Sequence, residues 1–150
     1  MNAKEYLKQI EKLNRQIENK MIEREQWRSI AHNVSSNWGG ERVQSSGNPE
    51  KMSTAIINYI DIETEINACI ADLIDKKKEI IGVIETLNAD EYDLLHKVYV
   101  QGLTLGEAAY ACDKSQTSIS TLHGRALKKV QDLIDEREKR NEESQNEFVS

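Results

Sequence analysis

Two helix-capping patterns that lie close together in the sequence constrain the fold of this chain more than any other feature. Thr104 precedes Glu107 by three positions, so the Thr104 hydroxyl can accept a hydrogen bond from the amide of Glu107 at the start of a helix. Ser115 can cap a second helix that runs from Gln116 toward Leu133. Because residues 112–114 alone separate the first helix from this second cap, the sequence predicts a helix-turn-helix.

A further helix is predicted before this motif, between Asn88 and Gly102. Asn88 can cap its start, with Glu91 in the first turn. Gly102 tolerates the left-handed conformation that commonly ends a helix. Asp113, in the turn of the motif, is one of the few other residue types that adopt this conformation readily.

The second helix of the motif has one apolar face and one polar face. Its apolar residues recur at steps of three and four, which places them on one inward stripe: Ile119, Leu122, Ala126, Val130 and Leu133. Helix-turn-helix proteins place the N-terminal residues of this helix in the major groove of DNA, where Gln can pair with adenine and a Thr methyl can pack on thymine. We therefore predict that bases are contacted by Gln116, Thr117, Ser120 and Thr121.

Cations near the same helix suit phosphates better than bases. The predicted phosphate contacts are Lys114, Ser115, Arg125, Lys128 and Lys129. Residues 104–129 hold four Lys or Arg side chains and two carboxylates, a net charge of +2, whereas the whole chain carries −6. Because DNA affinity comes largely from phosphate neutralisation, this modest charge predicts weak binding by a monomer and a need for a dimer or a partner.

Residues 1–86 are predicted to form a long antiparallel helical hairpin, coiled-coil-like, with a loop at 32–49 that contains Trp38. Pro49 suits the first position of its second helix. The apolar stripe of the first helix comprises Tyr6, Ile10, Leu13, Ile17, Trp27 and Ala31, with Lys20 and Arg24 as polar breaks. The second stripe comprises Met52, Ile56, Tyr59, Ile66, Ile70, Leu73, Ile80, Ile84 and Leu87, with Glu63 and Lys77 as breaks.

The expected organisation is therefore all-α, with three parts along the chain. The hairpin arm of residues 1–86 is followed by a helix-turn-helix domain at 87–136 and by a polar tail at 137–150 that is expected to be disordered. The hairpin arm is expected to form homo-oligomers or to contact a partner.

The segment from Leu87 to Leu133 resembles region four of bacterial sigma factors, and more closely the RinA/ArpU-like transcriptional regulators of phages that infect Gram-positive bacteria. The strings "YVQGLTLGEAA" and "SISTLHGRALKKV" carry the resemblance. It implies a late-gene activator that binds double-stranded promoter DNA and cooperates with host RNA polymerase, and it places the four base-contacting residues where such proteins read sequence. Ala108 replaces a larger aliphatic residue of the family, Asp113 replaces the usual Gly, and Lys114 replaces an apolar residue, either as a phosphate contact or through different local packing.

No catalytic residue, metal site or cofactor is expected. The histidines at 32, 96 and 123 have no acid and nucleophile nearby in the sequence, and His123 is expected to be solvated or to touch a phosphate. Cys69 and Cys112 form neither a disulfide framework nor a metal motif. No apolar run is long enough to span a bilayer, and the first residues lack the apolar core of a signal peptide. We therefore expect a cytoplasmic location in the host bacterium and no association with a membrane.

Two alternatives to a promoter-binding activator stay open. A small-terminase-like DNA-packaging protein would also join a helix-turn-helix to oligomerising helices. A helix-turn-helix that binds only protein would fit the acidic total, since any amphipathic helix in a small bundle gives a similar pattern.

Overall fold

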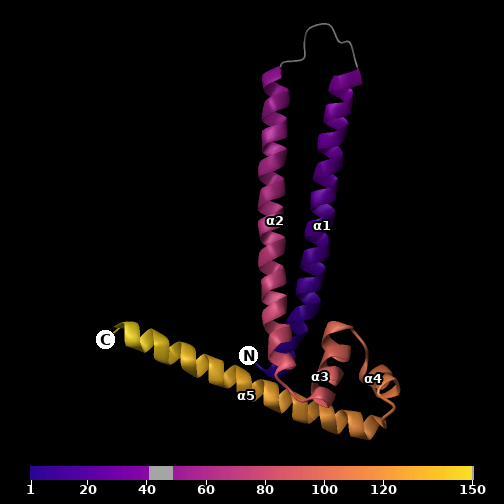
Figure 1. Ribbon diagram of the computed structural model, residues 1–150, viewed down its shortest axis with the longest axis vertical. Helices are drawn as coiled ribbons and strands as arrows, with labels where there is room; N and C mark the ends of the chain where they lie inside the picture. The colour runs from indigo at the N-terminus through magenta and orange to yellow at the C-terminus, as the bar shows by residue number, and fades with distance from the viewer. Residues whose placement is uncertain (41–48, 150) are drawn as a thin grey trace. The chain divides into compact units, whose positions relative to one another are not determined.

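A computed structural model describes the backbone of residues 1–40 and 49–149 and the side chains of residues 1–33 and 54–149. This part of the chain is helical and contains no strand (Figure 1). Its elements are α1 (Ala3–Gly40), α2 (Pro49–Glu85), α3 (Ala89–Leu95), a π-helical turn η1 (His96–Val100), α4 (Leu105–Ala111) and α5 (Gln116–Val149). The all-α prediction of a helical hairpin followed by a C-terminal helix-turn-helix is therefore confirmed.

The chain forms two compact units. We call Asn14–Asp75 the hairpin unit, and Met1–Leu13 together with Lys76–Ser150 the helix-turn-helix unit. Within the described residues, no helix is both long and apolar enough to cross a membrane.

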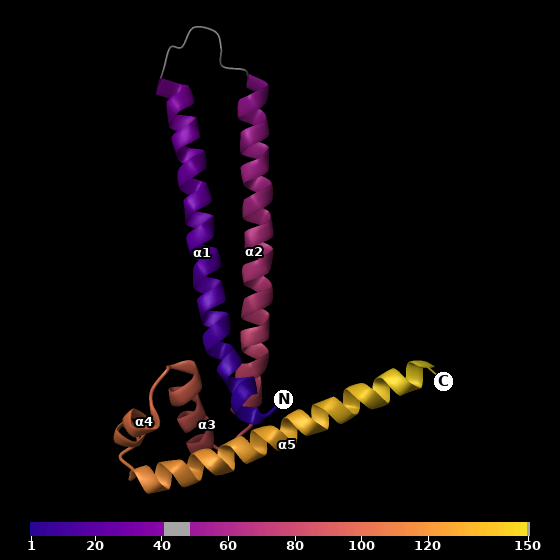
Figure 2. The same cartoon turned by 180° about the vertical axis from the view of Figure 1, so that it is seen from behind.

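In the hairpin unit, α1 and α2 run antiparallel (Figure 2). On α2, Ile66, Ile70 and Leu73 are buried, as their spacing predicts. Two of the polar breaks, Arg24 and Glu63, form interhelical pairs. Arg24 Nη1 donates to Asn67 Oδ1 at 2.9 Å, and Arg28 Nη2 lies 2.7 Å from Glu63 Oε1.

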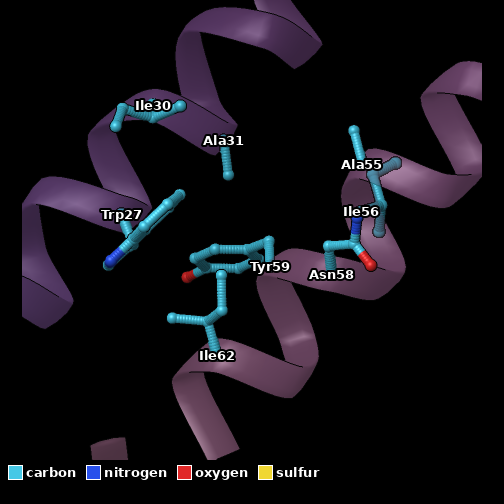
Figure 3. A pocket seen from close by; sticks show the side chains of 8 residues that line it. All are labelled: Trp27, Ile30, Ala31, Ala55, Ile56, Asn58, Tyr59 and Ile62. Carbon is cyan, nitrogen blue, oxygen red and sulfur yellow. The ribbon is translucent and has the colours of Figure 1, made fainter.

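The part of the hairpin unit around Trp27 and Ile56 packs loosely. Trp27 and Ile56 were expected on the inward stripes, but Trp27 is 40% exposed and Ile56 is 37% exposed. Both line a cavity of about 230 Å³ (Figure 3), where Ala31 and Ala55 are too small to fill the space between the helices. The complete lining is Trp27, Ile30, Ala31, Ala55, Ile56, Asn58, Tyr59 and Ile62.

The loop predicted at 32–49 is shorter than expected, because α1 continues to Gly40. Once a helix has formed, each further residue adds a backbone hydrogen bond without a new nucleation cost, and this outweighs the turn-favouring composition. The second helix begins at Pro49 as predicted. The side chains of Trp38 and Met52 and the whole of segment 41–48 lie outside the described residues.

The helix-turn-helix unit has a core drawn from both ends of the chain. The first turns of α1 contribute Ala3, Leu7, Ile10 and Leu13, and the end of α2 contributes Ile80, Val83 and Ile84. On α5 the buried residues include Ala126, Val130 and Ile134, whereas Leu133 is only partly buried. Ile10 and Leu13 are buried as predicted, whereas Leu7, which was missed, is fully buried in place of the predicted Tyr6, which is only partly buried.

The predicted disordered tail at 137–150 is instead part of α5, which continues to Val149. Every side chain from Asp135 to Val149 is exposed, so this extension has no apolar packing. Its many Glu, Lys, Arg and Gln residues favour helix. Arg140 Nη2 also lies 4.0 Å from Oε2 of Glu136, one helical turn earlier. Local propensity and continuity with the packed first half of α5 account for the helix.

Candidate nucleic-acid interface

Asn88 and Gly102 bound the helical segment before the motif, as predicted. The amide of Glu91 donates to Asn88 Oδ1 at 2.9 Å, and Asn88 Nδ2 donates to Glu91 Oε1 at 2.9 Å. Gly102 has a φ of 80°, a conformation that glycine adopts without strain. The π-helical turn η1 that lies between them was not predicted.

The caps and the turn of the helix-turn-helix also follow the sequence. The amide of Glu107 donates to Thr104 Oγ1 at 3.1 Å, and α4 begins at Leu105. Asp113 adopts the left-handed conformation with a φ of 54°. The amide of Ser118 then donates to Ser115 Oγ at 3.1 Å at the start of α5.

A small apolar cluster fixes α4 against α3 and α5. It consists of Leu94, Ala108, Ala109 and Ile119, with Val98, Cys112 and Leu122 packed on its edge. Ala108 is fully buried. The cluster therefore packs around an alanine at the position where the families that this segment resembles have a larger aliphatic residue. This packing sets the angle at which α5 leaves the turn.

The four predicted base-contacting residues lie on the exposed face of the first two turns of α5. Gln116, Thr117, Ser120 and Thr121 are all exposed, whereas Ile119 between them is fully buried. Their exposure matches the pattern, and their role in contacting bases stays a prediction. The Thr121 hydroxyl donates to the carbonyl of Thr117 at 3.0 Å, which leaves its methyl group and an oxygen lone pair for a partner.

Gly106 on α4 lies next to Gln116. A Cβ atom added to Gly106 would lie 3.5 Å from Gln116 Nε2, an ordinary van der Waals distance, so this part of α4 lies close to the Gln116 amide. One helical turn after Gly106, Tyr110 is 90% exposed on the same face of α4. Sequence patterning missed Tyr110, because an isolated aromatic residue in a short helix carries no periodic signal.

Two of the predicted phosphate-contacting lysines are already paired. Lys129 Nζ lies 2.7 Å from Glu91 Oε1, and Lys114 Nζ lies 3.9 Å from Asp90 Oδ2. Arg125 and Lys128 are exposed and have no ion-pair partner among the described residues. Arg125 and Lys128 are therefore the strongest cations available to a phosphate, and Lys129 has a structural role that the sequence did not indicate.

His123, which was expected to be solvated or to touch a phosphate, is partly buried and contacts Tyr99. Its Nε2 lies 2.9 Å from the Tyr99 hydroxyl, and the two rings stack with centroids 5.8 Å apart. Burial lowers the pKa of His123 below its usual value, and the nearby Lys4 ammonium lowers it further. A neutral imidazole at this position links α5 to η1.

The charge of α5 changes sign along its length. Arg125, Lys128 and Lys129 are followed by Asp132, Asp135 and Glu136. A polyanion will therefore favour the part of α5 before Asp132.

Comparison with known families supports this assignment of the motif. Residues 83–132 match the family model described as Sigma-70, region 4. This segment is therefore similar to region 4 of sigma-70 factors. It covers a third of the 150-residue chain and spans the elements from the end of α2 to the middle of α5, so we call residues 83–132 the region 4 segment. Comparison with curated proteins and with solved structures found no match.

Proposed function

We propose that the protein is a non-enzymatic, sequence-specific DNA-binding regulator of transcription. The observation that carries the proposal is the exposed polar face of α5, formed by Gln116, Thr117, Ser120 and Thr121 at the second helix of a region 4 segment. Gln can form two hydrogen bonds with adenine, and Thr methyl groups can contact thymine. Ser115, Arg125 and Lys128 flank this face and hold the phosphates.

The finer role proposed is that of a phage late-gene activator that acts with host RNA polymerase. It rests on the resemblance to the RinA/ArpU-like regulators and on the region 4 segment. The modest number of unpaired cations supports a need for a partner at the promoter, because few phosphate contacts give weak binding at physiological salt.

Self-association through the hairpin unit is the second part of the proposal. Met21, Ile22, Ile30, Ile57 and Ile60 are large apolar side chains exposed on α1 and α2. A dimer would double the number of phosphate contacts. Sedimentation should therefore show that Ile57→Glu with Ile60→Glu lowers the oligomeric state, while Ala68→Glu on an exposed position of the same helix does not.

The deciding experiment selects bound fragments from the source genome and then compares variants on the selected site and on random duplex. Gln116→Ala should reduce the preference for the selected site by about 10-fold, which corresponds to one bidentate base contact. Gln145→Ala is the matched control, because Gln145 is an exposed glutamine on the same helix. Equal losses on both duplexes for Gln116→Ala would contradict base reading.

A protein-binding helix-turn-helix is the second candidate, and the pairing of Lys114 and Lys129 with carboxylates favours it. It predicts that the full chain shows no salt-dependent affinity for any duplex. A ring-sized oligomer that binds DNA would instead favour a packaging role of the small-terminase type.

A further inference from the structure

The first turn of α1 is attached to α5 near the C-terminal end of the region 4 segment. The amide of Ala3 donates to Gln131 Oε1 at 2.7 Å, and Gln131 Nε2 donates to the carbonyl of Met1 at 3.4 Å. All three residues belong to the helix-turn-helix unit. Figure 1 shows the N-terminus beside the middle of α5.

Gln131 lies on the same side of α5 as the proposed DNA-binding face. It follows Gly124 by seven positions and Lys128 by three, and residues at these spacings share a helix face. Gly124 and Lys128 are exposed, and they continue the face that begins with Thr117, Ser120 and Thr121. The first turn of α1 therefore lies at the edge of this face.

Lys4 is the cation in that turn. Its side chain is exposed and has no ion-pair partner among the described residues. Its charge also acts on His123, which lies two turns before Gln131 on α5, and disfavours protonation of that imidazole. The Lys4 ammonium thus lies close enough to α5 for its charge to act on a residue of that helix.

We propose that Lys4 is an additional phosphate contact, so that the DNA-binding surface of this protein includes the first turn of α1 as well as the region 4 segment. The inference rests on the proposed function, since it needs a duplex on the exposed face of α5. It assigns a role in DNA binding to a residue far from residues 83–132 in the sequence. With Arg125 and Lys128, it raises the number of unpaired cations near the duplex to three among the described residues.

Counterion release gives the proposal a measurable signature. Each lysine that neutralises a phosphate steepens the plot of log affinity against log salt by about 0.9. Lys4→Ala should therefore make this slope shallower by about one. The affinity should fall by roughly 3- to 10-fold at low salt, equally on a selected site and on a random duplex, because phosphate contacts do not depend on sequence.

The matched control is Lys12→Ala. Lys12 is also an exposed lysine on α1. It lies eight residues after Lys4, about 12 Å further along the axis of α1 and away from the turn that contacts Gln131. Lys4→Arg should restore the slope, because arginine keeps the charge. Circular dichroism and urea unfolding of each full-length variant establish that the fold is intact.

The possible results separate the two proposals. Failure of the unsubstituted protein to bind any 30-base-pair duplex at low salt would overturn the proposed function. Binding by the unsubstituted protein with the same slope for Lys4→Ala would overturn the role of Lys4 alone. Equal effects of Lys4→Ala and Lys12→Ala would show a dependence on net charge only and would also overturn it. A change confined to Lys4→Ala and reversed by Lys4→Arg would support it.

Discussion

Lys129 of α5 donates a hydrogen bond to Glu91 of α3 across a distance of 2.7 Å, and this pair joins the second helix of the motif to the helix before the motif. Glu91 is only 3% exposed, and its Oε1 also accepts from the side chain of Asn88. Its Oε2 is buried and has no hydrogen-bond partner within the described part of the chain. The Lys129 ammonium is therefore the only cation paired with a buried carboxylate among the described residues.

Lys129→Ala should reduce the free energy of unfolding by about 1–3 kcal/mol, because it leaves the Glu91 carboxylate buried without its counter-charge. Urea unfolding followed by circular dichroism measures this change. Lys128→Ala is the control, since Lys128 is exposed and has no ion-pair partner among the described residues. We expect Lys128→Ala to leave stability nearly unchanged but to flatten the salt dependence of DNA binding. Equal stability losses for both variants would contradict the structural role of Lys129.

Gly124→Ala should increase stability and weaken DNA binding. Among the described residues, a Cβ atom at Gly124 would meet no neighbouring heavy atom within 4 Å, so alanine gains about 0.5–1 kcal/mol of helix propensity without a clash. On the proposed DNA-binding face the same methyl group would lie between the helix and the duplex.

Gly82→Ala provides the comparison for Gly124→Ala. Gly82 is also a helical glycine with open space around its Cβ position, but it lies on α2. Thermal unfolding should show similar stabilisation for both variants, while DNA titration should show a loss for Gly124→Ala only. Unchanged DNA affinity of Gly124→Ala would show that the duplex does not approach this part of α5 closely.

The stability of the helix-turn-helix unit should decrease as the pH falls below about 6.5. Burial and the Lys4 ammonium lower the pKa of His123 in the folded state. The unfolded chain therefore binds the proton first, and between the two pKa values protonation favours unfolding. The stability that His123 contributes is fully present above its pKa in the unfolded chain, and it is lost as the pH falls through its lower pKa in the folded protein.

Urea unfolding at a series of pH values between 8 and 5 tests this expectation, with His123→Gln as the comparison. Glutamine can still accept a hydrogen bond from the Tyr99 hydroxyl but does not titrate. The variant should lose the part of the pH dependence that arises from His123. Superimposable pH profiles for the two proteins would show that His123 is not responsible.

Ala31→Leu should stabilise the hairpin unit by about 1 kcal/mol, because the larger side chain fills part of the cavity beside Trp27 and Tyr59. Ala68→Leu, at an exposed position of α2, should have little effect. The measurement is the midpoint of thermal unfolding. A lower midpoint for Ala31→Leu would mean that the helices are held at their present distance and cannot accommodate the added volume.

The parts of the fold that could be predicted from sequence depend on contacts between near neighbours. Asn88, Thr104 and Ser115 each cap a helix by accepting from an amide three residues later, so their positions follow from the local pattern alone. Gly102 and Asp113 supply the left-handed conformations for the same reason. The exposure of the face of α5 that is predicted to contact bases likewise follows from helical periodicity.

The parts that could not be predicted depend on contacts between distant residues. Nothing near Lys129 in the sequence points to Glu91, and nothing near His123 points to Tyr99, which lies 24 positions earlier in the chain. Leu7 was missed because Tyr6 and Leu7 both fit an apolar periodicity, and the choice between them depends on the approach of α5. The helical tail was missed because composition alone separates a solvated helix poorly from a disordered segment.

Because the helix-turn-helix unit combines Met1–Leu13 with Lys76–Ser150, its core can form only after the chain has closed a long loop. On the ribosome, the first turns of α1 emerge well before α5, which must be synthesised before Ala3 and Leu7 can pack. The unit therefore matures late in translation, and shortening the hairpin should change how quickly it folds more than how stable it becomes.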